Sequence, residues 1–236
     1  MNLDFWFSEA QTPNVKLSIR VDHQLYSGKS EFQRIDVFES PEFGRFLTLD
    51  GYMMLTEKDE FIYHEMITHV PMAVHPKVRD VLVIGAGDGG VIRELSRYPE
   101  IEHIDMAEID PLVVEVCKKY LPQTACRLAD PRLSIHYEDG VRFVRSKENC
   151  YDLIIVDSTD PFGPGDGLFT REFYGSCFKA LREDGIMVNQ HESPFYAADA
   201  AACQRAHKLI VESFHISRVY QAHIPTYPSG HWLFGF

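Results

Sequence analysis

Short runs of alternating apolar and polar residues dominate the first 58 positions of the chain. Four such runs are separated by glycine, proline or Asp-Gly turns, at residues 16–26, 31–40, 45–50 and 52–56. Alternation over short runs is typical of half-buried β-strands, and Asp50-Gly51 between two of them is a strong hairpin signal. We therefore expect residues 1–58 to form a small antiparallel β-domain.

From residue 59 onward, strand-like and helical segments alternate. A first helix is expected over residues 58–75, ending near Pro71 or Pro76. Strands are then expected at residues 81–84, 103–109, 133–138, 152–157, 185–190, 216–221 and 231–236. Helices are expected at residues 89–98, 111–121, 141–146, 171–183 and 197–214. Such alternation predicts an α/β fold with a parallel sheet covered on both faces, so residues 59–236 should form a Rossmann-like domain with a mostly parallel seven-stranded sheet.

Composition narrows the choice of partners and compartment. The chain has 35 acidic and 23 basic residues and a formal net charge of -12. Such a field repels phosphate polymers and anionic membranes, so neither nucleic acid nor a membrane is an expected partner. The five cysteines form no C-x-x-C pair, and no signal peptide or membrane-spanning run is visible. These features together predict a cytoplasmic protein.

The segment VLVIGAGDGG, residues 81–90, contains the clearest candidate for ligand binding. Gly85, Gly87 and Gly90 match the G-x-G-x-x-G turn that holds a nucleotide between a strand and a helix, but Asp88 stands inside the turn. A pyrophosphate about 4 Å from that carboxylate would be destabilised by roughly 4 kcal/mol, which exceeds the stabilisation that a helix N-terminus gives to an anion. The sequence therefore favours a nucleoside ligand without phosphates, and a positive charge on it would make Asp88 an anchor.

An S-adenosyl sulfonium compound satisfies these conditions. Glu108 follows the glycines by about 20 residues, the spacing at which an acid binds ribose hydroxyls. Asp139 and Gly140 follow the next strand and are expected near the adenine, while Asp88 would meet a cationic tail. The alternative is a glycine turn with a purely structural role.

A second acidic cluster lies in the loop DSTDPFGPGDGLFT. Asp157 ends a buried strand and Asp160 follows three residues later, so the two can bind an ammonium group. An ammonium group with a pKa of about 10.4 is no nucleophile at neutral pH, and alkylating an amine therefore needs a base. We expect Asp157 to be that base and Asp160 to orient the amine, although acids in such loops also serve simple turn formation.

From about Leu25 to its last residue, the chain resembles the polyamine aminopropyltransferase family. The resemblance rests on GAGDGG, EID, EDG, VDSTDP, GPG with LFT, and IPTYPSG. It implies a fold of the class I methyltransferase type, decarboxylated S-adenosylmethionine as co-substrate, putrescine as acceptor and no further cofactor. It also implies a homodimer or homotetramer. Members of that family usually continue for several more elements beyond the strand expected at residues 231–236.

The resemblance assigns roles to individual residues. Asp157 would be the proton acceptor. The acceptor amine would be held by Tyr63, His64, Asp160, Gln190 and Tyr227. The donor would be held by Gln33, Gly85, Gly87, Asp88, Glu108, Asp139, Gly140 and Pro164. Without the resemblance, Gln33 would be expected to face solvent and His64 to lie on a helix surface.

Three further readings of the sequence bear on function. His64 and His69 are five residues apart, so on a helix they point about 140° apart and should not share a metal; no metal site is expected. An S-adenosylmethionine-dependent methyltransferase would also be served by the glycine turn and Glu108. A catalytically inactive polyamine- or nucleoside-binding protein is the third possibility, although it would be expected to lack one of the site acids.

Overall fold

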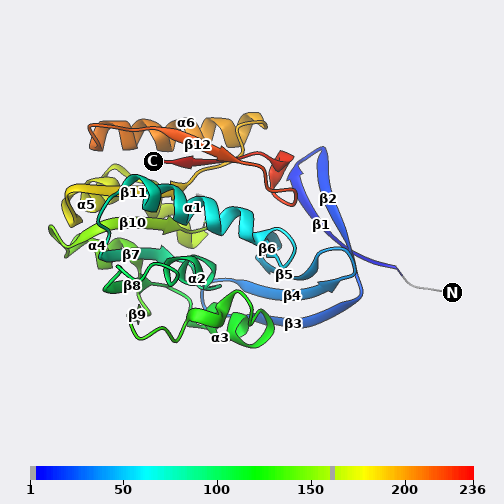
Figure 1. Cartoon of the computed structure of the whole chain (residues 1–236). Coiled ribbons are helices and arrows are strands. Elements are labelled where there is room, and N and C mark those ends of the chain that lie inside the picture. Colours follow the sequence, from blue (N-terminus) through cyan, green and yellow to red (C-terminus); the bar gives the residue numbers. More distant parts are fainter. Residues whose placement is uncertain (1–3, 160–162) are drawn as a thin grey trace.

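The computed structural model describes residues 4–159 and 163–236, without the side chains of residues 163, 164 and 166. Antiparallel strands come first in the chain and a helix-covered sheet follows (Figure 1). The predicted fold class, Rossmann-like α/β with an N-terminal antiparallel β region, is confirmed. In the part of the chain that is described, no helix has both the length and the apolar character of a membrane span.

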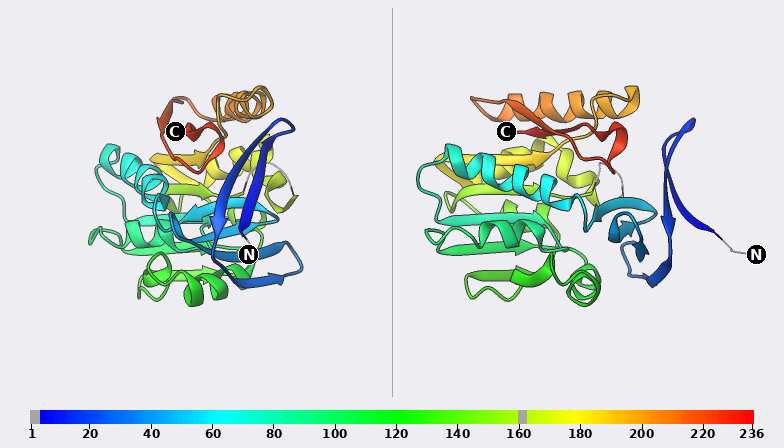
Figure 2. Two further views of the ribbon diagram at one scale, coloured as in Figure 1. Left: turned by 90° about the vertical axis from the view of Figure 1, so that its right-hand side faces the viewer. Right: turned by 45° about the vertical axis from the view of Figure 1, so that its right-hand side comes forward.

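The N-terminal strands form two antiparallel sheets. One is the hairpin of β1 (Phe5–Thr12) and β2 (Val15–Val21). The other is a four-stranded meander of β3 (His23–Lys29), β4 (Arg34–Ser40), β5 (Gly44–Leu49) and β6 (Tyr52–Thr56). Figure 2 shows the β1–β2 hairpin standing away from the helix-covered sheet, beside the meander.

Two details of the N-terminal prediction are wrong. The run over residues 16–26 is two strands, β2 and β3, which separate at Asp22 and join different sheets. Strand β1 was not predicted, because its inward-facing positions are Phe7, Glu9 and Gln11. Two of these three side chains are polar, so the strand lacks the apolar alternation that marks a half-buried strand.

The second part contains the predicted seven-stranded sheet, in the order β12-β13-β11-β10-β7-β8-β9. Only β13 runs antiparallel to its neighbours. The strands are β7 (Asp80–Gly85), β8 (His103–Ala107), β9 (Leu133–His136), β10 (Tyr151–Asp157), β11 (Leu181–Gln190), β12 (Val219–Ala222) and β13 (Trp232–Gly235). The chain order reverses between β7 and β10, and a ligand crevice is expected outside the carboxyl ends of strands at such a point.

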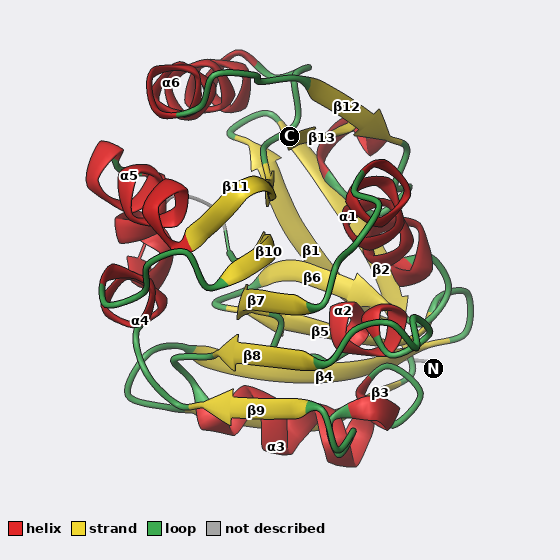
Figure 3. Cartoon of the chain, turned by 60° about the vertical axis from the view of Figure 1, so that its left-hand side comes forward, coloured by secondary structure: helices red, strands yellow, loops and turns green. Residues whose placement is uncertain are grey.

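Helices cover both faces of this sheet (Figure 3). They are α1 (Glu60–Val74), α2 (Gly90–Leu95), α3 (Pro111–Tyr120), α4 (Gly140–Arg145), α5 (Arg171–Ala180) and α6 (Ala197–Ser213). Short 3-10 helices are η1 (Ala125–Arg127), η2 (Gly163–Phe169) and η3 (Pro228–Gly230). Apolar residues of α1, α2 and α3 form one core with the meander and the sheet, and those of α4, α5 and α6 form a second core on the other face.

The end of α1 agrees with one of the two predicted end points, near Pro76, whereas the end of α5 differs from the prediction. Helix α1 continues through Pro71 and ends at Val74, where His75 is extended, as a residue before proline (here Pro76) tends to be. Helix α5 ends three residues earlier than the predicted 171–183, because Leu181 already pairs with Tyr151 as the first residue of β11. Tertiary strand pairing therefore overrides local helix propensity at this boundary.

The predicted Asp110-Pro111 helix start is confirmed and connects the two parts of the chain. Asp110 is fully buried, and its Oδ1 accepts a hydrogen bond from Leu112 N at 3.0 Å as the N-cap of α3. Its Oδ2 accepts from Ser30 Oγ at 2.7 Å and from Gln33 Nε2 at 3.0 Å. One carboxylate therefore caps a helix and fixes the loop before β4.

We expect Asp110→Ala to lower the free energy of unfolding by about 2–4 kcal/mol, because it removes a cap and takes away the acceptor of the buried Gln33 amide and of the partly buried Ser30 hydroxyl. Urea unfolding measures this change. Thr170→Ala is the control, since Thr170 caps α5 through a single bond to Phe173 N. That loss should be about 1 kcal/mol, and equal losses for the two variants would contradict the connecting role.

Candidate functional site

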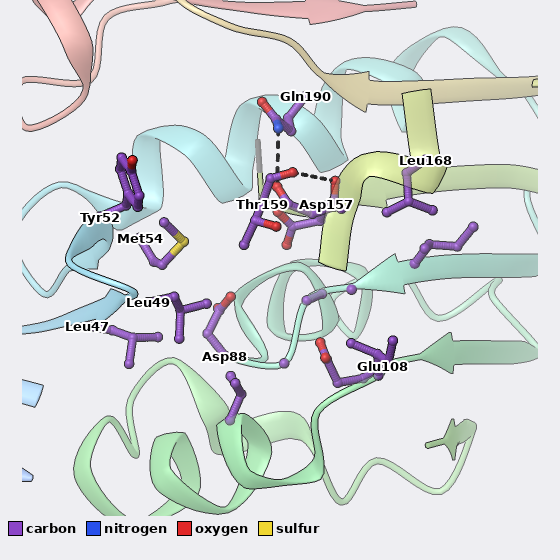
Figure 4. Close-up of a pocket in the computed structure, with 18 of the residues that line it drawn as sticks. Leu47, Leu49, Tyr52, Met54, Asp88, Glu108, Asp157, Thr159, Leu168 and Gln190 are labelled. Carbon is purple, nitrogen blue, oxygen red and sulfur yellow. Dashed lines mark hydrogen bonds between the residues drawn. The ribbon is translucent and has the colours of Figure 1, made fainter. Parts of the chain in front are cut away.

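A pocket lies where the carboxyl ends of β7, β8 and β10 face the N-terminal meander. Acidic side chains of Asp88, Glu108 and Asp157 come from the sheet side (Figure 4). Apolar and aromatic side chains come from the meander, among them Leu47, Leu49, Tyr52 and Met54. The pocket thus combines a charged wall and an apolar wall, and it uses both parts of the chain.

The sequence-predicted residues meet in this pocket. Those that line it are Gln33, Tyr63, His64, Gly85, Gly87, Asp88, Glu108, Asp139, Gly140, Asp157, Gln190 and Tyr227. Asp160 and the side chain of Pro164 lie outside the described residues, so their roles stay predictions. The prediction that acids at successive strand ends converge is therefore confirmed for Asp88, Glu108, Asp139 and Asp157.

The glycine turn brings β7 close to β10. Gly85 has a φ of +86°, and a Cβ there would lie 2.0 Å from the carbonyl oxygen of Asp157. The next residue, Ala86, donates its N–H to that same oxygen at 3.0 Å. Glycine is the residue that adopts this conformation at little cost, so the turn fixes the end of β10 and the residue that ends it.

Asp157 is the last residue of β10, and one of its two carboxylate oxygens accepts a hydrogen bond from within the described chain while the other does not. Tyr63 of α1 donates its hydroxyl to Oδ1 at 2.7 Å. Oδ2 is buried and has no hydrogen-bond partner among the described residues. Burial and the nearby charge of Asp88 raise the pKa of Asp157 to about 6, against the opposing effects of His64 and of the Tyr63 hydroxyl. The group is thus ionised near neutral pH and more basic than an ordinary aspartate.

If Asp157 acts as a base, we expect Tyr63→Phe to move the acid limb of the pH dependence of that activity to higher pH. The hydroxyl stabilises the Asp157 carboxylate, so its removal raises the pKa of Asp157 and protonates the group at pH values where it is ionised in the unaltered protein. Tyr174→Phe is the control, because its hydroxyl is buried in the core around α5 with no partner in the described chain. An unshifted limb in Tyr63→Phe would contradict the assignment.

His64 is buried, which corrects the helix-surface expectation. Its Nδ1 lies 2.5 Å from Glu60 Oε2, and its Nε2 lies 3.2 Å from Asp88 Oδ1. Burial alone would lower the pKa of His64, but the two carboxylates raise it to about 10. Sequence reasoning missed Glu60, although the spacing of Glu60 and His64, four residues apart on one helix, was an available signal.

The remaining acids of the pocket have structural partners as well. Glu108 Oε1 accepts from Asp110 N at 2.8 Å, and burial raises the pKa of Glu108 to about 7. Asp139 is the N-cap of α4 and accepts from Val141 N at 2.8 Å. Gln33 is buried, so the solvent-facing expectation is wrong: its amide binds Asp110 and the side chain reaches the pocket wall.

Aromatic rings close the pocket near Asp157. Tyr227 donates its hydroxyl to Met54 O at 2.6 Å, and its ring lies 4.8 Å from that of Trp232 and 5.9 Å from that of Tyr63. Ring faces attract cations. Gln190, at the end of β11, donates its amide to Ser158 O at 3.2 Å and so supports the loop after Asp157.

Among the described residues, two groups of side chains have ligand atoms close enough for a metal ion. In the pocket, His64, Asp88 and Asp157 each offer an atom within 4.8 Å of the others, but the two carboxylates next to His64 raise its pKa to about 10 against the effect of burial, which favours a protonated ring over a metal ligand. The second group is Glu65, His69 and Glu94, where Glu94 already pairs with two arginines. His64 and His69 belong to separate groups.

These features define a class of protein. A Rossmann-like sheet opens at its switch point on a pocket with acids, a buried histidine and aromatic rings, which suits a positively charged nucleoside and an amine. A model described as a spermine/spermidine synthase domain matches residues 60–236, and a model described as a spermidine synthase tetramerisation domain matches residues 5–57. The chain belongs to the spermine/spermidine synthase family and is an enzyme of the polyamine aminopropyltransferase class.

Curated relatives and solved structures agree with this placement. The chain is 72% identical to a polyamine aminopropyltransferase of Alkaliphilus oremlandii and 71% identical to one of Clostridium perfringens, over 99% of its own length and 82% and 83% of theirs. It matches a crystal structure of a spermidine synthase in complex with the transition state analogue AdoDATO, with a TM-score of 0.95 and 46% identity. A spermidine synthase structure from Thermotoga maritima gives 0.94 and 45%. Both matches cover 98% of this chain, and 79% and 78% of the solved chains.

Proposed function

We propose that this enzyme transfers the aminopropyl group of decarboxylated S-adenosylmethionine to putrescine, giving spermidine and 5'-methylthioadenosine. The observation that carries the proposal is the Asp157 carboxylate, which lies beside aromatic rings and has one buried oxygen, Oδ2, without a hydrogen-bond partner among the described residues. A buried acceptor oxygen of this kind suits an ammonium group that must lose a proton. The spermidine synthase matches support the same reaction.

The reaction needs positioning and the removal of one proton. The diamine nitrogen attacks the aminopropyl carbon next to the sulfonium; the new C–N bond forms as the C–S bond breaks, and the electron pair of that bond passes to sulfur. Asp157 takes the proton that the nitrogen loses. With a pKa of about 6, it is ionised at neutral pH and closer to the working pH than an ordinary aspartate. The rest of the rate enhancement comes from holding the diamine nitrogen in line with the C–S bond that breaks.

We propose that the donor lies along the ends of β7, β8 and β9. Asp88 would bind its amine, Glu108 its ribose, and Asp139 with Gly140 its adenine, while Gln33 closes the pocket from the meander side. The decarboxylated donor has an amine and no carboxylate at the end of its tail. An acid at position 88 therefore suits it better than it suits ordinary S-adenosylmethionine, which favours aminopropyl transfer over methyl transfer.

We propose that the acceptor diamine lies between Asp157 and the aromatic rings. Tyr63 and Tyr227 flank that space, and Gln190 and His64 line it. Asp160 would hold the amine as well, by the family resemblance. The side chains that reach the pocket suit ammonium groups, and we propose that no metal or other cofactor takes part, because the pocket's imidazole nitrogen is committed to Asp88.

We further propose a homodimer or homotetramer in the cytoplasm. The match of residues 5–57 to a tetramerisation domain supports assembly, and Phe5 and Trp6 on β1 are 63% and 60% exposed, which suits an apolar contact between copies. The five cysteine thiols are free, as expected in a reducing compartment.

A mass-spectrometric assay tests the proposed reaction. The enzyme is incubated with the decarboxylated donor and, in separate reactions, with 1,3-diaminopropane, putrescine or cadaverine. We expect aminopropyl transfer with 5'-methylthioadenosine as the co-product, and the highest kcat/KM for putrescine. A parallel reaction with S-adenosylmethionine serves as control and should give no methylated amine. Methyl transfer without aminopropyl transfer, or binding of methylthioadenosine without turnover with any diamine, would contradict the proposal.

A further inference from the structure

Four side chains that can carry charges of alternating sign form a continuous chain from α2 to the wall of the pocket. Arg93 of α2 donates to both carboxylate oxygens of Glu60, at 2.7 and 3.0 Å. Glu60 contacts His64 Nδ1, and His64 Nε2 faces Asp88 Oδ1. The order toward the pocket is Arg93, Glu60, His64 and Asp88, and the side chains of Glu60 and His64 are only 6% and 3% exposed.

The geometry determines the protonation state of His64. Both ring nitrogens lie within hydrogen-bond distance of a carboxylate oxygen, and an ionised carboxylate only accepts. A neutral imidazole has one N–H, so it would leave one of these contacts without a donor. Arg93 holds Glu60 ionised, and Asp88 Oδ1 also accepts from Gly90 N at 2.7 Å, which favours its charged form. The ring is therefore an imidazolium.

The ring is also fixed in place by its neighbours. A Cβ on Gly90, the first residue of α2, would lie 2.2 Å from His64 Cε1, so the imidazole fills the space against the helix backbone. The ring of Tyr63 lies edge-on to it at 5.4 Å. The backbone of α2 and the ring of Tyr63 therefore leave the imidazole little room to turn away from its two carboxylate partners.

We propose that Glu60, supported by Arg93, is a positioning residue that holds His64 as an imidazolium and thereby keeps both Asp88 and Asp157 ionised toward the pocket. The inference deepens the proposed function and rests on it, because it concerns the same two acids. Asp88 and Asp157 are partly buried and repel each other, and the charge of His64 opposes the resulting rise in the pKa of Asp157. Without that cation, Asp157 would take up a proton at a higher pH. A protonated Asp157 is no base, and a protonated Asp88 is no anchor for an ammonium group.

The groups that face His64 define how its charge depends on pH. They are Glu60 and Tyr63 from α1, Asp88 from the glycine turn and Asp157 from the end of β10, with Arg93 acting through Glu60. The pKa of His64, about 10, is raised by Asp88 and by Glu60 against the effect of burial. Loss of the Glu60 charge must therefore lower the pKa of His64, so that the imidazole ring loses its second proton at a lower pH.

An NMR titration of histidine ring nitrogens tests the inference without turnover. The full-length protein carries ¹⁵N in its histidine rings, and His64→Gln identifies the signal of His64. We expect His64 to stay protonated to about pH 9 in the unaltered protein and to lose its proton at least about one pH unit lower in Glu60→Gln. Glu94→Gln is the matched control, because Glu94 is equally buried and also pairs with Arg93 but does not contact His64; its titration should follow the unaltered protein.

The pH profile of kcat/KM provides the second measurement. In His64→Gln the cation that lowers the pKa of Asp157 is absent at every pH, so the acid limb should move to higher pH. Glu60→Asp, which keeps the negative charge next to His64, should leave the His64 titration close to that of the unaltered protein. A neutral His64 at pH 8 in the unaltered protein would overturn the inference, as would an unchanged titration in Glu60→Gln. If Glu60→Gln does not fold, the protonation state of His64 at pH 8 in the unaltered protein is sufficient to support or overturn the inference. A protonated His64 in an enzyme that transfers no aminopropyl group would instead contradict the proposed function.

Discussion

Replacing Asp157 by asparagine is expected to lower turnover by about 10²–10⁴-fold, the range that a positioned general base contributes. The amide keeps the shape of the side chain and can still accept the Tyr63 hydroxyl at the Oδ1 position. It cannot take a proton from the diamine, so the nitrogen stays protonated and without a free electron pair. Single-turnover assays at saturating donor and putrescine measure the loss in the chemical step.

The same substitution should leave donor binding largely intact, because the amine, ribose and adenine of the donor are assigned to other residues. Calorimetric titration with methylthioadenosine checks this. Asp152→Asn is the matched control: Asp152 lies on the same strand, but at the end away from the pocket, where it pairs with Arg182. It should alter stability and leave turnover nearly unchanged. Unchanged turnover in Asp157→Asn would show that the base lies elsewhere.

Asp88→Asn is expected to weaken binding of the decarboxylated donor by about 10- to 150-fold, the equivalent of one charge-assisted hydrogen bond of about 1.5–3 kcal/mol. Asp88 Oδ1 is already used by Gly90 N and His64, so the proposed contact with the donor amine falls to Oδ2. The asparagine keeps a polar group in the turn but removes the charge that an ammonium group needs.

Comparing two ligands separates the anchor from a general effect on the pocket. Methylthioadenosine contains the ribose and adenine of the donor but lacks the amine of its aminopropyl tail. When both ligands are measured without acceptor, the dissociation constant of methylthioadenosine should therefore change much less than that of the donor. Both constants can be measured by calorimetry on the same preparation. An equal loss for the two ligands would mean that Asp88 supports the glycine turn and does not anchor the amine.

Most of the fold could be predicted because its signals are local. Strands of alternating or continuous apolar residues and helices with caps such as Asp110 are set by residues close together in the chain. Parallel strands place their carboxyl ends at one edge, so acids that follow successive strands, as Asp88, Glu108 and Asp157 do, converge without knowledge of the packing. Strand β1 could not be predicted in this way, because Glu9 and Gln11 occupy its inward-facing positions and break the apolar alternation.

The sequence by itself determined which acids the sheet brings to the pocket, and that these acids suit a cationic nucleoside and an amine. Glu9 of β1 also lines the pocket and was not predicted. The tertiary structure alone decided how those acids are charged. Glu60 and Arg93 are 33 positions apart and meet only when α1 packs on α2, and this contact encloses His64 between two carboxylates. The charge of a buried group depends on which dipoles and ions replace its water, and long-range packing supplies them, so a linear pattern of residues cannot define it.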